Sequence, residues 1–131
     1  MDEYLKLLEK YKFEKYLNKL NKKLNGKRVV IYGAGTFFKK IKENYDLSKL
    51  NIVGISDIKY SQEQEGSLDY GYKIIPKDNL EKHNTDVVLI AVLNCFQIYK
   101  GFKKGKYRNS KIKFYPLVDK PFFELLIEAF S

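Results

Sequence analysis

The chain has 131 residues, a formal net charge of +9 and 44% hydrophobic residues. This length and hydrophobic content are typical of one globular domain and exclude a disordered chain. No run of about 18 apolar residues occurs, which argues against a membrane-spanning helix, and the single cysteine, Cys95, excludes an internal disulfide. Together with an acidic rather than basic N-terminus, these features predict a cytoplasmic protein without a signal peptide.

The positive charge comes almost entirely from lysine, since Arg28 and Arg108 are the two arginines among 25 basic residues. The lysines are spread along the chain, whereas base and phosphate recognition favours the planar fork of arginine. We therefore expect a solvated basic surface. A phosphate-rich small ligand or an anionic membrane surface is the next alternative, and nucleic acid is the least expected partner.

Residues 2–24 carry apolar side chains at helical spacing, which predicts one amphipathic helix. Asn25 and Gly26 follow and supply a left-handed helix stop. We expect this N-terminal segment, residues 1–26, to dock on the flank of a domain formed by residues 27–131 or on another subunit. A homodimer joined by the terminal helices is one such arrangement.

Short apolar runs alternate with helical patterns along the rest of the chain. Strands are expected at residues 28–32, 51–57, 73–75, 86–93 and 111–117, and helices at 36–45, 76–83, 95–104 and from Asp119 onward, with a polar loop at 62–72. The fourth run is unbroken and apolar, which implies a strand buried on both faces at the centre of the sheet, beside the first strand. The pattern predicts an α/β doubly wound parallel sheet of about five strands, in the order 3-2-1-4-5.

The turn after the first strand carries the clearest functional motif, Gly33-Ala34-Gly35-Thr36. In a strand–turn–helix unit the first glycine permits a tight reversal, and the second lets a ligand phosphate approach the backbone. The N–H groups of the helix start and the positive end of the helix dipole would face that anion. The motif predicts a nucleotide site; the alternative is a fold that has kept the turn and lost the ligand.

Two further positions bear on this site. Asp57 ends the second strand 22 residues after Gly35, at the distance where an acid takes a ribose hydroxyl. Phe38 stands where the full fingerprint has a small residue, so we expect the helix to lie farther from the sheet or to rotate. We expect Asp57→Ala to weaken ligand binding with little loss of stability. A β-branched residue at Gly35 should damage binding and stability if that position has a positive φ.

Two isolated side chains offer little chemistry. Cys95 follows the fourth strand, but no histidine is positioned to activate it, so we expect a buried or pocket-lining residue rather than a nucleophile. One histidine, His83, and one cysteine make no metal site. The residues therefore assign no catalytic group.

Four segments together resemble a known arrangement: Val-Ile-Tyr-Gly-Ala-Gly (30–35), Ile-Val-Gly-Ile-Ser-Asp (52–57), Gly-Tyr-Lys-Ile-Ile-Pro (71–76) and Asp-Val-Val-Leu-Ile-Ala-Val (86–92). Their layout is similar to the small nucleotide-binding domain at the front of bacterial polysaccharide-biosynthesis enzymes. These enzymes include the capsule-type sugar-nucleotide dehydratases and the sugar acyltransferases. The resemblance covers about two-thirds of the chain, and we expect no catalytic domain of either enzyme within these 131 residues.

The resemblance implies a Rossmann-like fold that binds NAD(P) or a UDP-sugar. Carried over to this chain, Gly33, Ala34, Gly35, Thr36 and Asp57 would line the site, flanked by Ala91, Val92 and Leu93. The resulting hypothesis is a free-standing nucleotide-binding protein that serves surface-polysaccharide sugar biosynthesis as a subunit or accessory. The alternatives are a non-catalytic interaction or regulatory module with a vestigial nucleotide site, and a small methyltransferase-like domain.

Overall fold

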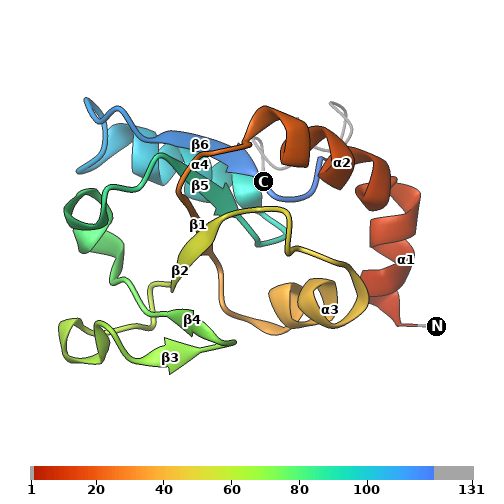
Figure 1. Cartoon of the computed structure of the whole chain (residues 1–131), viewed down its shortest axis with the longest axis horizontal. Helices are drawn as coiled ribbons and strands as arrows, with labels where there is room; N and C mark the ends of the chain where they lie inside the picture. Colours follow the sequence, from red (N-terminus) through yellow and green to blue (C-terminus); the bar gives the residue numbers. More distant parts are fainter. Residues whose placement is uncertain (1, 120–131) are drawn as a thin grey trace.

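The computed structural model describes residues 2–119. Its centre is a parallel four-stranded sheet in the order β2-β1-β5-β6 (Figure 1). The strands are β1 (Val29–Tyr32), β2 (Ile52–Ser56), β5 (Val87–Ile90) and β6 (Lys113–Pro116). All residues of β1 and β5 are buried, as the apolar runs predict for the centre of a parallel sheet. The predicted α/β, Rossmann-like class is confirmed.

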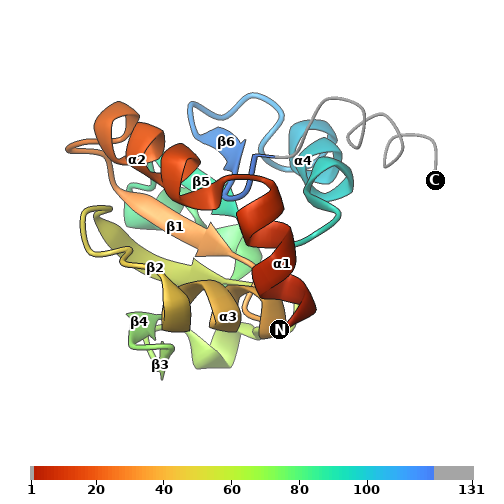
Figure 2. The same cartoon turned by 90° about the vertical axis from the view of Figure 1, so that its right-hand side faces the viewer.

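Helices cover both faces of the sheet (Figure 2). One face packs against α1 (Glu3–Lys10), α2 (Phe13–Lys23) and α3 (Thr36–Asn44), and the other against α4 (Cys95–Lys104). Successive residues of β1 point to opposite faces, so Ile31 joins the first core cluster and Val30 and Tyr32 join the second. The helices of the N-terminal segment thus contribute to the same core as the sheet.

The third predicted strand is present only as a single point of pairing. Ile74 forms one parallel bridge with Ile55 of β2, and Pro76, two residues further on, cannot donate to a ladder. The residues before Ile74 fold back as the hairpin of β3 (Leu68–Asp69) and β4 (Tyr72–Lys73), mostly inside the stretch expected to be a polar loop. The sheet therefore has four strands rather than five, and its order β2-β1-β5-β6 differs from the predicted 3-2-1-4-5 by the missing third strand.

The N-terminal segment forms two helices, so the prediction of one continuous helix is wrong. Asp2 caps α1 by accepting from the N–H of Tyr4 at 2.8 Å, and Lys12 takes a left-handed conformation with φ of 53° between the helices. Leu8 and Phe13 are both buried, although five residues on a straight helix would turn them about 140° apart. The bend at Lys12 lets both side chains reach the core.

The remaining expectations differ in detail. The helix predicted at 76–83 is two short 3-10 turns, η2 (Lys77–Asn79) and η3 (Glu81–His83), and a third, η1 (Gln62–Gln64), follows β2. The closing helix expected from Asp119 onward falls outside the described residues. Across residues 2–119, no helix combines the length and the apolar character that crossing a membrane requires.

A partly buried hydrogen bond attaches α2 to the last strand. The hydroxyl of Tyr16 donates to the carbonyl of Pro116 at 2.9 Å. Burial is the main reason that the pKa of Tyr16 is raised, and the Asp119 charge adds to it. The tyrosine therefore stays protonated and remains a donor throughout the range in which the protein would be studied.

Removing this hydroxyl gives a direct test of the α2 attachment. We expect Tyr16→Phe to lower the free energy of unfolding by about 1 kcal/mol, because the partly buried carbonyl of Pro116 loses its donor. Urea denaturation measures the change. Tyr99→Phe, at a more exposed position on α4, is the matched control and should stay within about 0.5 kcal/mol of the unmodified protein. An equal loss in the two variants would contradict the assigned role.

Candidate functional site

Gly33 closes the glycine turn against the end of β5. Its φ is +118°, and a Cβ there would lie 2.8 Å from the carbonyl oxygen of Ala91 and 2.9 Å from Cγ1 of Val92. A residue with a side chain here would therefore have a strained backbone conformation, and its Cβ would clash with the carbonyl of Ala91. The first glycine is needed for packing β1 beside β5, whether or not a ligand binds.

Gly35 has different surroundings. Its φ is −100°, and it is the N-cap of α3 without a side-chain cap; a Cβ built on it would meet nothing within 4 Å. The first N–H groups of an α-helix have no acceptor inside the helix. The exposed residues Gly35 and Thr36 thus leave open space where an anion could approach. Because φ is negative, a β-branched residue here would carry no left-handed backbone penalty.

The tip of β2 lies directly against the turn. Oδ2 of Asp57 accepts from the N–H of Ala34 at 2.7 Å, and Oδ1 accepts from the N–H of Lys59 at 3.0 Å. The carboxylate is thus a built-in anion for one amide of the turn. Since Asp57→Ala would remove both bonds, the expectation of little stability loss no longer holds; a loss of about 1–3 kcal/mol is now expected.

Two side chains that the sequence analysis did not select hold the other side of the turn. Nζ of Lys59 donates to the carbonyl of Ala34 at 3.0 Å. The hydroxyl of Tyr70 donates to the same carbonyl at 3.1 Å and to that of Gly35 at 3.3 Å. Lys59 could have been suspected from its place two residues beyond the acid. Tyr70 gave no sequence signal, because its contact depends on the hairpin.

Phe38 does not fill the space beside Gly35. Its ring is fully buried in the first core cluster and lies edge-on to the ring of Tyr70, with centroids 5.4 Å apart and planes at 73°. The large residue at this position of the fingerprint is therefore accommodated by the hairpin. The turn itself stays open at Gly35.

The end of β5 supplies the opposite wall. Ala91 is buried and its N–H donates to the carbonyl of Tyr32 at 2.7 Å, Val92 is half-buried, and Leu93 is exposed. The structure thus brings Ala91 and Val92 against Gly33. Burial, and then the charge of Asp57, raise the pKa of Tyr32 beneath the turn.

Cys95 is buried, as expected. It lines an apolar cavity of about 190 Å³ between α4 and the ends of β5 and β6, together with Ile90, Phe96, Tyr99, Phe114 and Pro116. Within residues 2–119, no group of three His, Cys, Asp or Glu side chains is placed to hold a metal ion.

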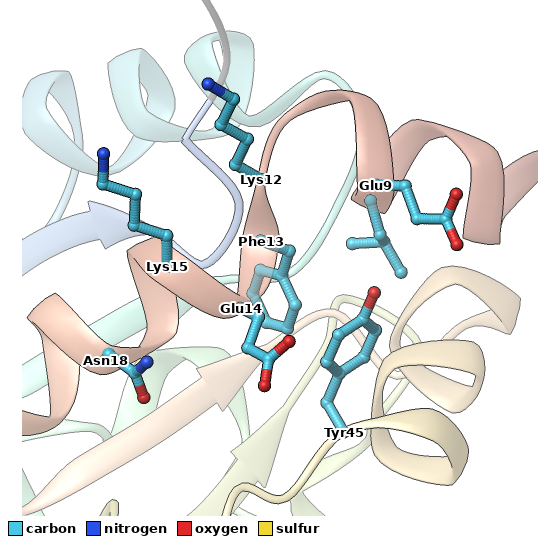
Figure 3. Close-up of a pocket in the computed structure, with 8 residues that line it drawn as sticks. Glu9, Lys12, Phe13, Glu14, Lys15, Asn18 and Tyr45 are labelled. Atoms are coloured by element: carbon cyan, nitrogen blue, oxygen red, sulfur yellow. The ribbon is translucent and has the colours of Figure 1, made fainter.

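A separate surface hollow of about 510 Å³ lies at the bend between α1 and α2 (Figure 3). Leu8, Phe13 and Tyr45 line it from the core side, and the carboxylates of Glu9 and Glu14 lie near the Tyr45 hydroxyl. Burial is the main cause of a raised Tyr45 pKa, and the two glutamates add to it. None of the residues predicted for the nucleotide site lines this hollow.

Comparison with known proteins gives a family and a general fold. The family model described as C2185-like, N-terminal matches residues 25–113. No curated protein matches the chain. Solved structures similar to it include RSP in complex with beta-NAD+ and operator DNA, at 18% identity and a TM-score of 0.44, which covers 83% of this chain and 54% of that one.

Two more solved structures are similar. UDP-D-quinovosamine 4-dehydrogenase from Vibrio fischeri has 16% identity and a TM-score of 0.43, covering 79% of this chain and 84% of that one. RSP in complex with beta-NADH has 16% identity and a TM-score of 0.44, and the match covers 88% of this chain and 65% of that one. The chain thus spans about half to two-thirds of the RSP chains. At these identities and TM-scores the likenesses carry no conclusion about a ligand.

The two glycines of the turn should respond differently to the same substitution. We expect Gly33→Ala to lower the free energy of unfolding by about 2–4 kcal/mol, through its positive φ and the collision with Ala91. Gly35→Ala should change it by no more than about 1 kcal/mol, because the added methyl group enters open space and the remaining cost is that alanine is a poorer N-cap than glycine. Urea denaturation of both variants measures the difference. Similar losses at the two positions would contradict this assignment.

Proposed function

The chain belongs to the C2185-like, N-terminal family, and we propose that it is a nucleotide-binding protein whose ligand is NAD(P) or a nucleotide-sugar such as a UDP-sugar. The observation that carries the proposal is the difference between the two glycines of the turn. Packing accounts for Gly33, whereas no protein atom approaches the Cβ position of Gly35. A phosphate close to the backbone would account for the second glycine.

The proposed site lies at the carboxyl edge of the sheet, between the ends of β1, β2 and β5. Its phosphate-facing part is Gly35 and Thr36 at the start of α3, with Asp57 beside the ribose. Gly33, Ala34, Ala91 and Val92 form the floor, and Leu93 lies on the rim. These residues supply backbone donors, one carboxylate and apolar contact, which suit binding of a nucleotide.

We place this protein in surface-polysaccharide sugar biosynthesis as a subunit or accessory protein. The support is the similarity of four segments to the front domain of such enzymes, given above. A single unit of this size leaves little room for a second substrate, so turnover would require a partner enzyme or a second copy to complete the pocket. A partner of that kind would bring its catalytic group to the open edge beside Gly35.

A non-catalytic interaction module is the second candidate, and one contact favours it. The carboxylate of Asp57 already occupies the N–H of Ala34 at 2.7 Å and is thus held inside the protein. A turn that supplies its own anion is consistent with a fold that has lost its ligand. In that case Gly35 would have no role beyond beginning α3.

Thermal unfolding separates the two candidates. A ligand at 100 times its dissociation constant adds about 2.7 kcal/mol of stability, which raises the melting temperature by several degrees in a domain of this size. We expect such a shift from at least one of NAD, NADP and UDP-N-acetylglucosamine. S-adenosylmethionine belongs in the panel as the test of a methyltransferase-like site. No shift from any compound would support the interaction module.

Gly35→Ala then locates the binding site. The new methyl group should cost about 1.4 kcal/mol or more of binding free energy, a tenfold or greater loss of affinity, because it occupies the space proposed for the phosphate. Isothermal titration with the compound that shifts melting measures the loss. Gly101→Ala is the matched control, since Gly101 on α4 also has no atom within 4 Å of its Cβ position. Unchanged affinity in Gly35→Ala would place the ligand elsewhere.

A further inference from the structure

We propose that Tyr70 is a positioning residue of the nucleotide site: together with Lys59 it holds the glycine turn so that two backbone N–H groups face the ligand. This inference rests on the proposed function. It concerns a residue of the β3–β4 hairpin that the nucleotide-binding motif does not include. The same contacts also explain why a tyrosine occupies an unfavourable backbone conformation.

The orientation of the amides follows from peptide geometry. In a trans peptide the C=O and the next N–H point in opposite directions, and the described residues contain no cis peptide. The carbonyl of Ala34 points to Lys59 and Tyr70, at 3.0 and 3.1 Å, so the N–H of Gly35 points away from them. The carbonyl of Gly35 accepts from the N–H of Lys39 at 3.1 Å in the first turn of α3 and also lies 3.3 Å from the Tyr70 hydroxyl, so the N–H of Thr36 points the same way.

The N–H of Ala34, the third amide of the turn, points to a side chain of the protein instead of away from it. The N–H of Ala34 donates to Oδ2 of Asp57 at 2.7 Å. Side chains from two segments thus fix both ends of the Ala34 residue, with Asp57 and Lys59 beyond β2 and Tyr70 on the hairpin. The N–H groups of Gly35 and Thr36 are left turned toward the exposed side of the turn.

Tyr70 makes these contacts from a strained position. It occupies the two-residue loop of the hairpin with Gly71, at φ of 54° and 80° respectively. Asn-Gly is the usual choice for such a loop, because a bulky residue at positive φ is disfavoured. Strain of this kind persists where surrounding contacts over-determine the conformation. Here those contacts are the two carbonyl bonds and the edge-on packing against Phe38.

The hairpin is itself fixed to the tip of β2. The hydroxyl of Tyr60 donates to Oδ2 of Asp69 at 2.5 Å, and Ile74 pairs with Ile55 in a parallel bridge. Burial raises the pKa of Tyr60 and of Tyr70, and nearby carboxylates add to both shifts. Both hydroxyls therefore keep their protons. Tyr70 is consequently held at the turn by a rigid support rather than by a free loop.

The test compares Tyr70→Phe with Tyr72→Phe. Tyr72 lies on the same hairpin with its ring centroid 6.5 Å from that of Phe38, and within the described residues its hydroxyl makes no bond to the turn. The probes are NAD, NADP and UDP-N-acetylglucosamine, with affinities from isothermal titration. The amide NMR signals of Gly35 and Thr36 are followed in the protein without and with probe.

We expect Tyr70→Phe to bind the probe about tenfold more weakly, the loss that one positioning hydrogen bond would cause. Its Gly35 and Thr36 amide signals should also move before any probe is added, whereas Tyr72→Phe should show neither change. If a probe binds the unmodified protein and its affinity is the same in Tyr70→Phe, the inference is overturned and the proposed function stands. If no probe binds the unmodified protein, the proposed function fails and the inference with it.

Tyr70→Asn keeps the test valid if loss of the tyrosine disturbs folding. Asparagine suits the left-handed position but cannot span to the turn. We expect this variant to unfold at a temperature no lower than Tyr70→Phe while binding the probe as weakly or more weakly. Affinity restored to that of the unmodified protein in Tyr70→Asn would show that only the hairpin conformation matters, and would overturn the role of the hydroxyl.

Discussion

The close approach of Gly33 to Ala91 governs the geometry of the whole carboxyl edge. The two central strands can lie side by side up to their last residues only because no Cβ stands between them. Their junction fixes where the chain leaves the sheet and therefore where α3 begins. The tip of β2 and the hairpin then pack around the point where the chain leaves β1, and the packing of β1 against β5 determines that point.

The central elements could be predicted because each of their sequence patterns is compatible with only one type of secondary structure. Four consecutive buried positions in β1 and in β5 correspond to apolar runs too short for a helix, and α4 begins and ends where its pattern does, at Cys95 and Lys104. Burial on both faces marks the two runs as central strands of a parallel sheet. The sheet order follows, since connections between parallel strands are right-handed and short.

The elements that the sequence did not reveal depend on contacts between distant residues. The bend at Lys12 arises because Leu8 and Phe13 must both reach a core that the helix pattern alone does not define. The hairpin could not be predicted from its polar stretch of sequence. Its strands are only two residues each, and Tyr70 is not a usual turn residue. Asp57 was predicted as a site residue, but its bond to Ala34 could not be derived from spacing.

The pairing of Asp57 and Lys59 around the Ala34 peptide has an electrostatic consequence. A carboxylate and an ammonium group both contact this one residue, so their charges largely cancel at a distance of a few ångströms. The net charge of +9 is carried by other basic side chains, among them the exposed Lys39 in the first turn of α3, and is screened by salt over about 10 Å. Long-range attraction of an anion to this edge would therefore come from Lys39 and other surface lysines rather than from Lys59, and would weaken as salt is added.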